Sequence, residues 1–201
     1  MTDAESPWLA LLHDPPAGAH VILWCDETPA CHVAMETFLD GGLQRDDLCV
    51  VVLPMGDLDM LRSRLLTREF DLDCLGDQGR VLVTTPENLG LREVGDADRI
   101  ATIAADLRRL AQACGRSGVT VLGRVAPPFF ESGRREAAEA LERALRDYAS
   151  DVRMLCPYRV DSVRPRQMGE AAAVIRCHTH AVTLIGGDQL FMEPVHTPAG
   201  V

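Results

Sequence analysis

Two buried strands joined by one helix, within residues 20–54, constrain the fold of this chain more than any other stretch. Residues 20–25 (HVILWC) are almost wholly apolar, as expected of a strand that is covered on both faces. Gly41-Gly42 is expected to end the following helix, and residues 49–54 form the next apolar strand. A strand–helix–strand unit of this kind predicts a parallel α/β sheet.

The turn after the first strand argues against a nucleotide site. Residues 25–29 (CDETP) contain no glycine and two acids, whereas phosphate-binding loops in this architecture are rich in glycine. All 20 basic residues are arginines, so reactions that need a lysine are excluded. The net charge of −10 predicts that the chain does not bind nucleic acid directly, because phosphate binding needs clustered basic side chains.

The alternation of apolar strands and amphipathic helices continues to the end of the chain. Further strands are expected at residues 80–84, 118–125 and 151–156, and further helices from Asp57, over 96–113, from Ser132 and over 165–176. Residues 180–191 predict an antiparallel hairpin that turns at residues 186–188. The expected fold is a three-layer α/β/α sandwich with a mostly parallel sheet and a C-terminal β-hairpin. Its expected divisions are a lead-in (1–19), one domain (20–195) and a tail (196–201).

The cysteine content and the hydropathy of the chain indicate the cellular compartment in which it is found. Seven cysteines, an odd number at irregular spacing without a C-x-x-C motif, indicate reduced thiols and a cytoplasmic location. No run of about 18 apolar residues is present, so no membrane span is predicted. The acidic start of the chain does not resemble a secretory signal.

Ligands of parallel α/β sheets bind beyond the carboxyl ends of the strands, which are apolar and thiol-rich in this sequence. That character suits recognition better than hydrolysis. The residues expected to bind a ligand are His20, Trp24, Cys25, Asp26, Cys156, Tyr158, His178 and His180.

No catalytic residue and no cofactor are expected, since no nucleophile elbow, H-E-x-x-H motif or dinucleotide fingerprint occurs. Acids beside Cys25 disfavour its thiolate, and His32 is expected to point to solvent. A non-enzymatic protein is therefore predicted.

The sequence Cys177-His178-Thr179-His180 is the densest group of soft metal ligands. In a strand His178 and His180 would share a side, and Cys25, Cys156 or His20 could complete a tetrahedral site. The alternative is a helix end followed by a strand, with one histidine satisfying backbone carbonyls. Both readings stay open at the level of sequence.

Three segments together resemble the MEDS domain, a sensory domain of the DcmR type. They are His20 at the start of the first strand, residues 38–43 (FLDGGL) and residues 155–158 (LCPY), followed by the Cys-His-Thr-His segment and the glycine turn. The resemblance implies a RecA- or KaiC-like fold without a Walker motif, and a sensor of small molecules such as hydrocarbon derivatives. Trp24 stands where that family's pattern leads us to expect a tyrosine.

The resemblance also implies how such a sensor acts. Residues 1–19 show no helix-turn-helix, so signalling is expected through a regulatory protein (a kinase, a sigma-factor regulator or a transcription factor) or through a homodimer. Two alternatives remain: a ligand-independent interaction scaffold, and a metal or redox sensor that uses Cys177, His178 and His180.

Overall fold

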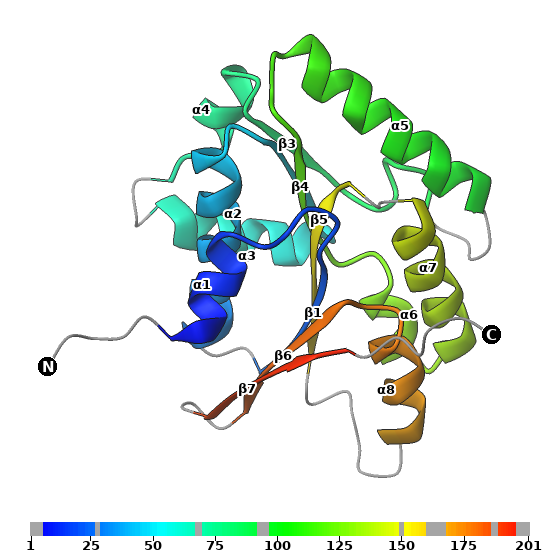
Figure 1. Ribbon diagram of the computed structural model, residues 1–201. Helices are drawn as coiled ribbons and strands as arrows, with labels where there is room; N and C mark the ends of the chain where they lie inside the picture. Colours follow the sequence, from blue (N-terminus) through cyan, green and yellow to red (C-terminus); the bar gives the residue numbers. More distant parts are fainter. Residues whose placement is uncertain are drawn as a thin grey trace, which may run out of the picture.

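The sheet at the centre of the molecule is parallel except at one edge (Figure 1). The computed structural model describes residues 6–26, 29–66, 70–91, 97–148, 151–159, 168–185 and 189–195. Within them the strand order is β3-β2-β4-β5-β1-β6-β7, and only β6 and β7 pair antiparallel. The strands are β1 (His20–Cys25), β2 (Leu48–Val52), β3 (Val81–Thr84), β4 (Val119–Gly123), β5 (Arg153–Arg159), β6 (His180–Ile185) and β7 (Gln189–Pro194).

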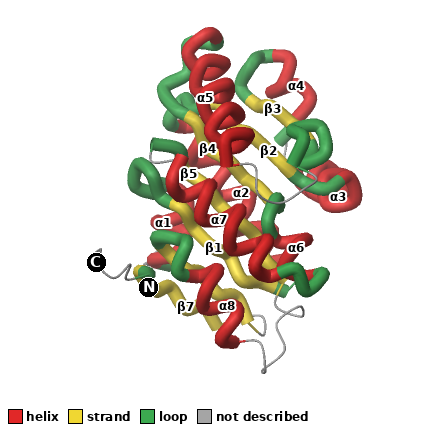
Figure 2. The backbone as a smooth tube through the Cα atoms, turned by 90° about the vertical axis from the view of Figure 1, so that its right-hand side faces the viewer, coloured by secondary structure: helices red, strands yellow, loops and turns green. Residues whose placement is uncertain are grey.

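Helices cover both faces of this sheet and so make the expected three layers. The helices are α1 (Pro7–His13), α2 (Pro29–Gln44), α3 (Met55–Leu66), α4 (Leu72–Asp77), α5 (Ala97–Ala113), α6 (Pro127–Glu131), α7 (Arg135–Tyr148) and α8 (Met168–Ile175). Apolar side chains of α1–α4 form one core with one face of the sheet, and those of α5–α8 form a second core on the other face. Figure 2 looks onto the face that α5–α8 cover.

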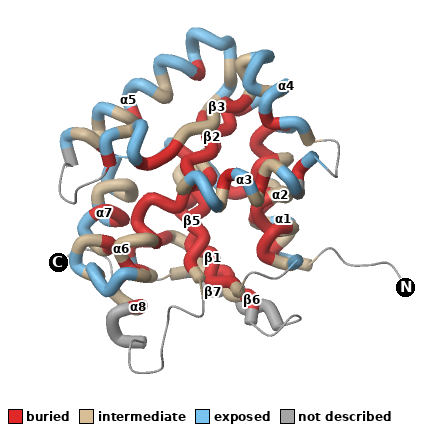
Figure 3. Tube along the Cα trace, turned by 180° about the vertical axis from the view of Figure 1, so that it is seen from behind, coloured by how far each residue is buried: buried red, intermediate tan, exposed pale blue. Residues whose placement is uncertain are grey.

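The apolar runs became strands because they are buried on both sides. All six residues of β1 and all five of β2 are buried, as Figure 3 shows for the centre of the molecule. Continuous apolar runs, rather than alternating ones, are what a sheet covered by helices requires. The α/β sandwich predicted from the sequence is confirmed, and the predicted hairpin is β6–β7, although its turn lies outside the described residues. The hairpin also extends the parallel sheet, because β6 pairs with β1.

Three predicted boundaries are wrong for reasons of packing. Gly41-Gly42 does not end a helix; α2 continues to Gln44, and both glycines allow close contacts with neighbouring elements. Pro157 does not end β5, since it lies past the last residue pair of β5 with β4 and pairs with Leu23 of β1 alone. Ser132 does not begin a helix: it follows α6, and α7 begins at Arg135.

Helix α1 belongs to the same body as the sheet. Trp8 and Leu12 of α1 are buried in the core beneath α2. The expected tail, residues 196–201, lies outside the described residues.

Candidate functional site

A small pocket lies beyond the carboxyl ends of β1, β2, β4 and β5, between α2 and α3. We call it the α2–α3 pocket, and its volume is about 50 Å³. Its lining is apolar over most of its area, with charged groups at one side. It is lined by Cys25, Asp26, Cys31, His32, Met35, Leu53, Asp57, Met60, Leu61, Arg124, Pro157, Tyr158 and Arg159.

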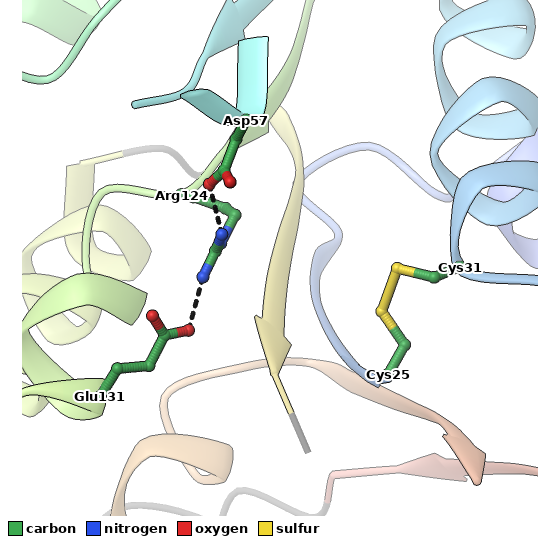
Figure 4. Close-up of a disulfide and its surroundings, with 5 residues drawn as sticks. All are labelled: Cys25, Cys31, Asp57, Arg124 and Glu131. Carbon is green, nitrogen blue, oxygen red and sulfur yellow. Dashed lines mark hydrogen bonds and ion pairs between the residues drawn. A yellow bond between two sulfur atoms is a disulfide. The ribbon is translucent and has the colours of Figure 1, made fainter. Parts of the chain in front are cut away.

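A disulfide between Cys25 and Cys31 forms part of the pocket wall (Figure 4). Cys25 ends β1 and Cys31 lies in the first turn of α2, so the bond closes the turn where nucleotide-binding relatives carry a phosphate loop. The prediction of reduced thiols is wrong for this pair, because the turn brings two cysteines six residues apart to a Cα–Cα distance of 5.8 Å. The cytoplasmic location that rested on reduced thiols stays a prediction.

His32 also lines this wall and is buried, so the prediction that it points to solvent is wrong. The reason is the orientation of α2, which turns the Cys31 and His32 side of its first turn toward the pocket while Pro29 is exposed.

Ion pairs close the other side of the pocket. The Arg124 guanidinium, which follows β4, donates hydrogen bonds to Asp57 of α3 and to Glu131 of α6 (Figure 4). Arg159 at the end of β5 donates to the second oxygen of Asp57 at 3.1 Å. Asp57, at which the sequence predicts the start of a helix, lies instead inside the first turn of α3 and links three elements around the pocket.

A second group of polar side chains lies on the opposite face of the sheet, fully enclosed. His20 Nε2 lies 3.1 Å from Glu142 Oε2 and 3.3 Å from Cys156 Sγ. His178 Nε2 lies 3.5 Å from the same Glu142 oxygen, and the Tyr158 hydroxyl donates to Glu142 Oε1 at 2.6 Å. We call His20, Glu142, Cys156 and His178 the buried cluster.

Burial controls the protonation of this cluster. Burial alone raises the pKa of Glu142, but His178, His20 and the Tyr158 hydroxyl outweigh it and hold that pKa at about 2. Burial, followed by His20, lowers the pKa of His178 to about 3 despite the nearby carboxylate. Burial and the Glu142 charge raise the pKa of the Cys156 thiol and of the Tyr158 hydroxyl well above their ordinary values.

The residues predicted to bind a ligand are therefore divided between two places. Cys25, Asp26 and Tyr158 line the α2–α3 pocket. His20, Cys156 and His178 belong to the buried cluster instead, so the prediction that the Cys/His segment and Cys156 converge on the pocket is wrong. The physical reason is the alternation of side chains along β5: Cys156 faces the α7 side of the sheet and the next residue faces the α2 side.

Trp24 lies in the core on the α7 side. Its ring contacts the rings of Phe130 and Tyr158, with centroids 5.7 and 4.8 Å away. All three are buried and fill the core beside the buried cluster; of the three, Tyr158 alone also lines the α2–α3 pocket, so Trp24 does not contribute to it.

Cys177 and His180 do not join His178 in a metal site. The Cys177 sulfur approaches the carbonyl oxygens of Ala173 and Glu139, and His180 Nδ1 lies 2.9 Å from the Thr179 hydroxyl. Among the described residues, the group that could hold a metal ion is the buried cluster. The three residues of that alternative are not grouped in the structure, where the chain turns between α8 and β6.

Several residues of the α2–α3 pocket and of the buried cluster could not be identified from the sequence. Glu142 belongs to a helix rich in Glu and Arg, where its pattern is that of a solvated face, yet it is completely buried. Met35 and Met60 fit ordinary helix faces, and their common pocket is visible only in the tertiary structure.

Comparison with known proteins agrees with this architecture. Residues 19–179 match the family model described as MEDS, the MEthanogen/methylotroph, DcmR Sensory domain. The chain belongs to the MEDS family. The resemblance noted from its sequence is thereby confirmed, and with it the chain's character as a sensory domain.

The MEDS domain is also similar in fold to a solved structure. A KaiC-like protein from the hyperthermophilic archaeon Pyrococcus horikoshii OT3 matches with a TM-score of 0.53 and 13% sequence identity, covering 88% of this chain and 77% of that one. This supports the predicted RecA- and KaiC-like fold. No curated protein matches the chain significantly. In the described part of the chain, no helix is long and apolar enough to cross a membrane.

Proposed function

We propose that this MEDS domain binds a small, largely apolar ligand in the α2–α3 pocket and reports its presence to a regulatory protein. The observation that supports this most is the position of the pocket. It lies beyond the carboxyl ends of parallel strands, where open α/β sheets bind ligands, and where relatives with a phosphate loop bind nucleotides. Here the disulfide and an apolar wall occupy that place.

The size of the pocket limits the ligand. A cavity that accepts benzene has a volume of about 150 Å³, whereas this pocket measures about 50 Å³. The ligand is therefore a compound of few non-hydrogen atoms, such as a small hydrocarbon derivative. Arg124 and Asp57 at the rim offer it a polar contact.

The pocket is built for binding and not for covalent chemistry. Cys25 and Cys31 are bonded to each other and offer no thiolate. Asp57 is held by Arg124 and Arg159, so its carboxylate is committed to ion pairs. A non-enzymatic role follows from this as part of the proposal.

Signalling requires that occupancy changes a surface. The two walls belong to different helices, and α3 carries two exposed apolar side chains, Met55 and Leu66, each 58% exposed. A shift of α3 on ligand binding would move these side chains and give a partner protein a surface that differs between the free and bound states.

Methionine methyl NMR tests the ligand. Met35 and Met60 line the pocket, whereas Met55 is exposed and Met154 is buried on the other face. A panel of small alcohols, aldehydes, amines and halogenated hydrocarbons should include a compound that shifts the Met35 and Met60 signals and leaves Met154 unchanged. Met60→Trp should abolish the shift of Met35, and Met55→Trp on the same helix is the control that should retain it.

The same variants separate a sensor from a scaffold. A partner recovered with the wild-type protein should bind with an affinity that changes when the ligand is added, and Met60→Trp should remove that change. A partner that binds equally with and without ligand, together with a panel that shifts no pocket methionine, would contradict the proposal and favour a ligand-independent scaffold.

A further inference from the structure

The buried cluster brings together donor atoms from four separate parts of the chain. His20 begins β1, Cys156 lies in β5, Glu142 lies in α7 and His178 follows α8. One donor atom from each lies within 4.8 Å of all the others, and all four residues are at least 96% buried. Buried polar groups are costly unless they are paired, so such a grouping needs a physical reason.

His178 uses one ring nitrogen, Nδ1, in a hydrogen bond, and its other ring nitrogen, Nε2, faces the Glu142 carboxylate. The Val174 carbonyl lies 2.9 Å from His178 Nδ1 and can only accept, so Nδ1 carries the proton. In the neutral ring Nε2 then presents a lone pair toward Glu142 Oε2, which is also an acceptor. His178 Nε2 is buried and makes no hydrogen bond with any residue that the structure describes. A cation between the two atoms removes this conflict.

The separations of the donor atoms fit a tetrahedral metal ion. Zinc bonds of about 2.0–2.2 Å to nitrogen or oxygen and about 2.3 Å to sulfur place neighbouring ligand atoms roughly 3.3–3.6 Å apart. Four of the six separations are 3.1 Å (His20–Glu142), 3.3 Å (His20–Cys156), 3.5 Å (His178–Glu142) and 3.8 Å (Cys156–Glu142), and the four residues offer donor atoms that all lie within 4.8 Å of one another.

The surroundings also resemble those of metal ligands. Metal-bound histidines donate their other N–H to a carbonyl or carboxylate, as His178 does to Val174, whereas His20 Nδ1 has no such acceptor among the described residues. The second oxygen of Glu142 accepts from Tyr158, which fixes the carboxylate. Two imidazoles and a thiol select a first-row transition metal over Mg²⁺ or Ca²⁺, which prefer oxygen ligands.

We propose that the MEDS domain binds a divalent transition-metal ion, Zn²⁺ first, through His20 Nε2, Glu142 Oε2, Cys156 Sγ and His178 Nε2. Four protein ligands in a closed cavity make this a structural site. The ion joins β1, β5, α7 and the segment between α8 and β6, and it is bound as the chain folds, because the ligands meet only in the folded state. The site is separate from the α2–α3 pocket, so a failure of either proposal leaves the other standing.

Metal analysis of untagged protein, produced in medium supplemented with zinc, tests the proposal. The wild type should contain about one Zn²⁺ per chain, and Cys156→Ser and His178→Gln should each retain less than about a tenth of that. Cys177→Ser and His180→Gln are matched controls from the neighbouring positions, and both should keep the metal. Loss of zinc in the controls but not in the cluster variants would overturn the assignment.

Cobalt substitution keeps the test decisive if the cluster variants do not fold. Wild-type protein unfolded with a chelator and refolded with Co²⁺ should show the visible absorption of tetrahedral cobalt and a thiolate-to-cobalt charge-transfer band. Wild-type protein that is purified without zinc, and that refolds with Co²⁺ without these bands, would overturn the proposal and leave a proton between His178 and Glu142.

Discussion

The seven cysteines occupy three kinds of surroundings, and these decide their reactivity. Cys25 and Cys31 are bonded to each other. Cys74 and Cys114 are exposed and free, whereas Cys49, Cys156 and Cys177 are buried and free. Burial raises the pKa of all three buried thiols, that of Cys49 to about 12, and so suppresses the reactive thiolate.

Thiol counting should therefore give three different results. With a thiol reagent at about pH 8, where exposed cysteines react, the native protein should react rapidly at two sites, Cys74 and Cys114. Unfolding in denaturant and chelator without reductant should expose five thiols, and prior reduction should raise the number to seven.

Replacing Cys74 and Cys114 by serine should abolish the rapid native reaction, which serves as the control for the assignment. Seven thiols in the unfolded, unreduced protein would show that Cys25 and Cys31 are not bonded. In that case the expectation of reduced thiols would be restored.

Two glycines of α2, Gly41 and Gly42, determine how closely this helix packs against its neighbours. A Cβ on Gly41 would lie 1.8 Å from the His13 carbonyl oxygen of α1, and one on Gly42 would lie 2.8 Å from Cys49 Sγ of β2. These two glycines, expected to end the helix, allow α2 to approach α1 on one side and the sheet on the other. The position of α2 in turn places Cys31, His32 and Met35 at the pocket.

Gly41→Ala should destabilise the protein strongly, because the new methyl group meets backbone and not a flexible side chain. We expect a loss of about 3 kcal/mol in the free energy of unfolding, at the upper end for overpacking. Gly56→Ala in α3 is the matched control, since nothing lies within 4 Å of its Cβ position. It should stabilise the protein by about 0.5–1 kcal/mol through helix propensity. Urea unfolding measures both, and equal effects of the two substitutions would contradict this role of Gly41.

Over the whole molecule, the strands differ in how well they are protected. β1, β2, β4 and β5 each pair with a strand on both sides and lie between two layers of helices, whereas β7 pairs with β6 alone. Both proposed sites depend on the protected strands: β1 and β5 contribute residues to the buried cluster and to the α2–α3 pocket. A sensor with two sites on a common rigid sheet can change at its helices while the sheet stays intact.

Amide hydrogen exchange should show directly that the central strands are better protected than the edge strands. Amides of β1 and β5 should exchange only through global unfolding, and their opening free energy should equal that from urea unfolding. Amides of β7 should exchange at least about 100-fold faster, because an edge strand opens locally. β3, the opposite edge, is the internal comparison and should also exchange faster than β1. Equal protection of β1 and β7 would contradict this picture.

The secondary-structure elements and the fold class could be predicted from local patterns of residues. In runs such as His20–Cys25, every residue after the histidine is apolar, and that local pattern suffices to predict a strand covered on both faces. The family resemblance and the absence of a phosphate loop could likewise be read from the residues. The predicted ends of α2 and β5 are wrong because tertiary contacts outweigh the local preferences of glycine and proline. Gly41 lies against His13, and Pro157 pairs with β1.

The composition of the two sites depends on contacts between distant parts of the chain, which local patterns do not contain. Glu142 has the sequence pattern of a solvated helix residue, and it is buried because α7 turns that position toward β1 and β5. His20 and Cys156 are 136 residues apart and meet because β1 and β5 are neighbours in the sheet. Cys25 and Cys31 meet through the geometry of one turn. Hydrophobic periodicity is a local property that records which face of an element is covered, but strand order and helix rotation determine which side chains meet there.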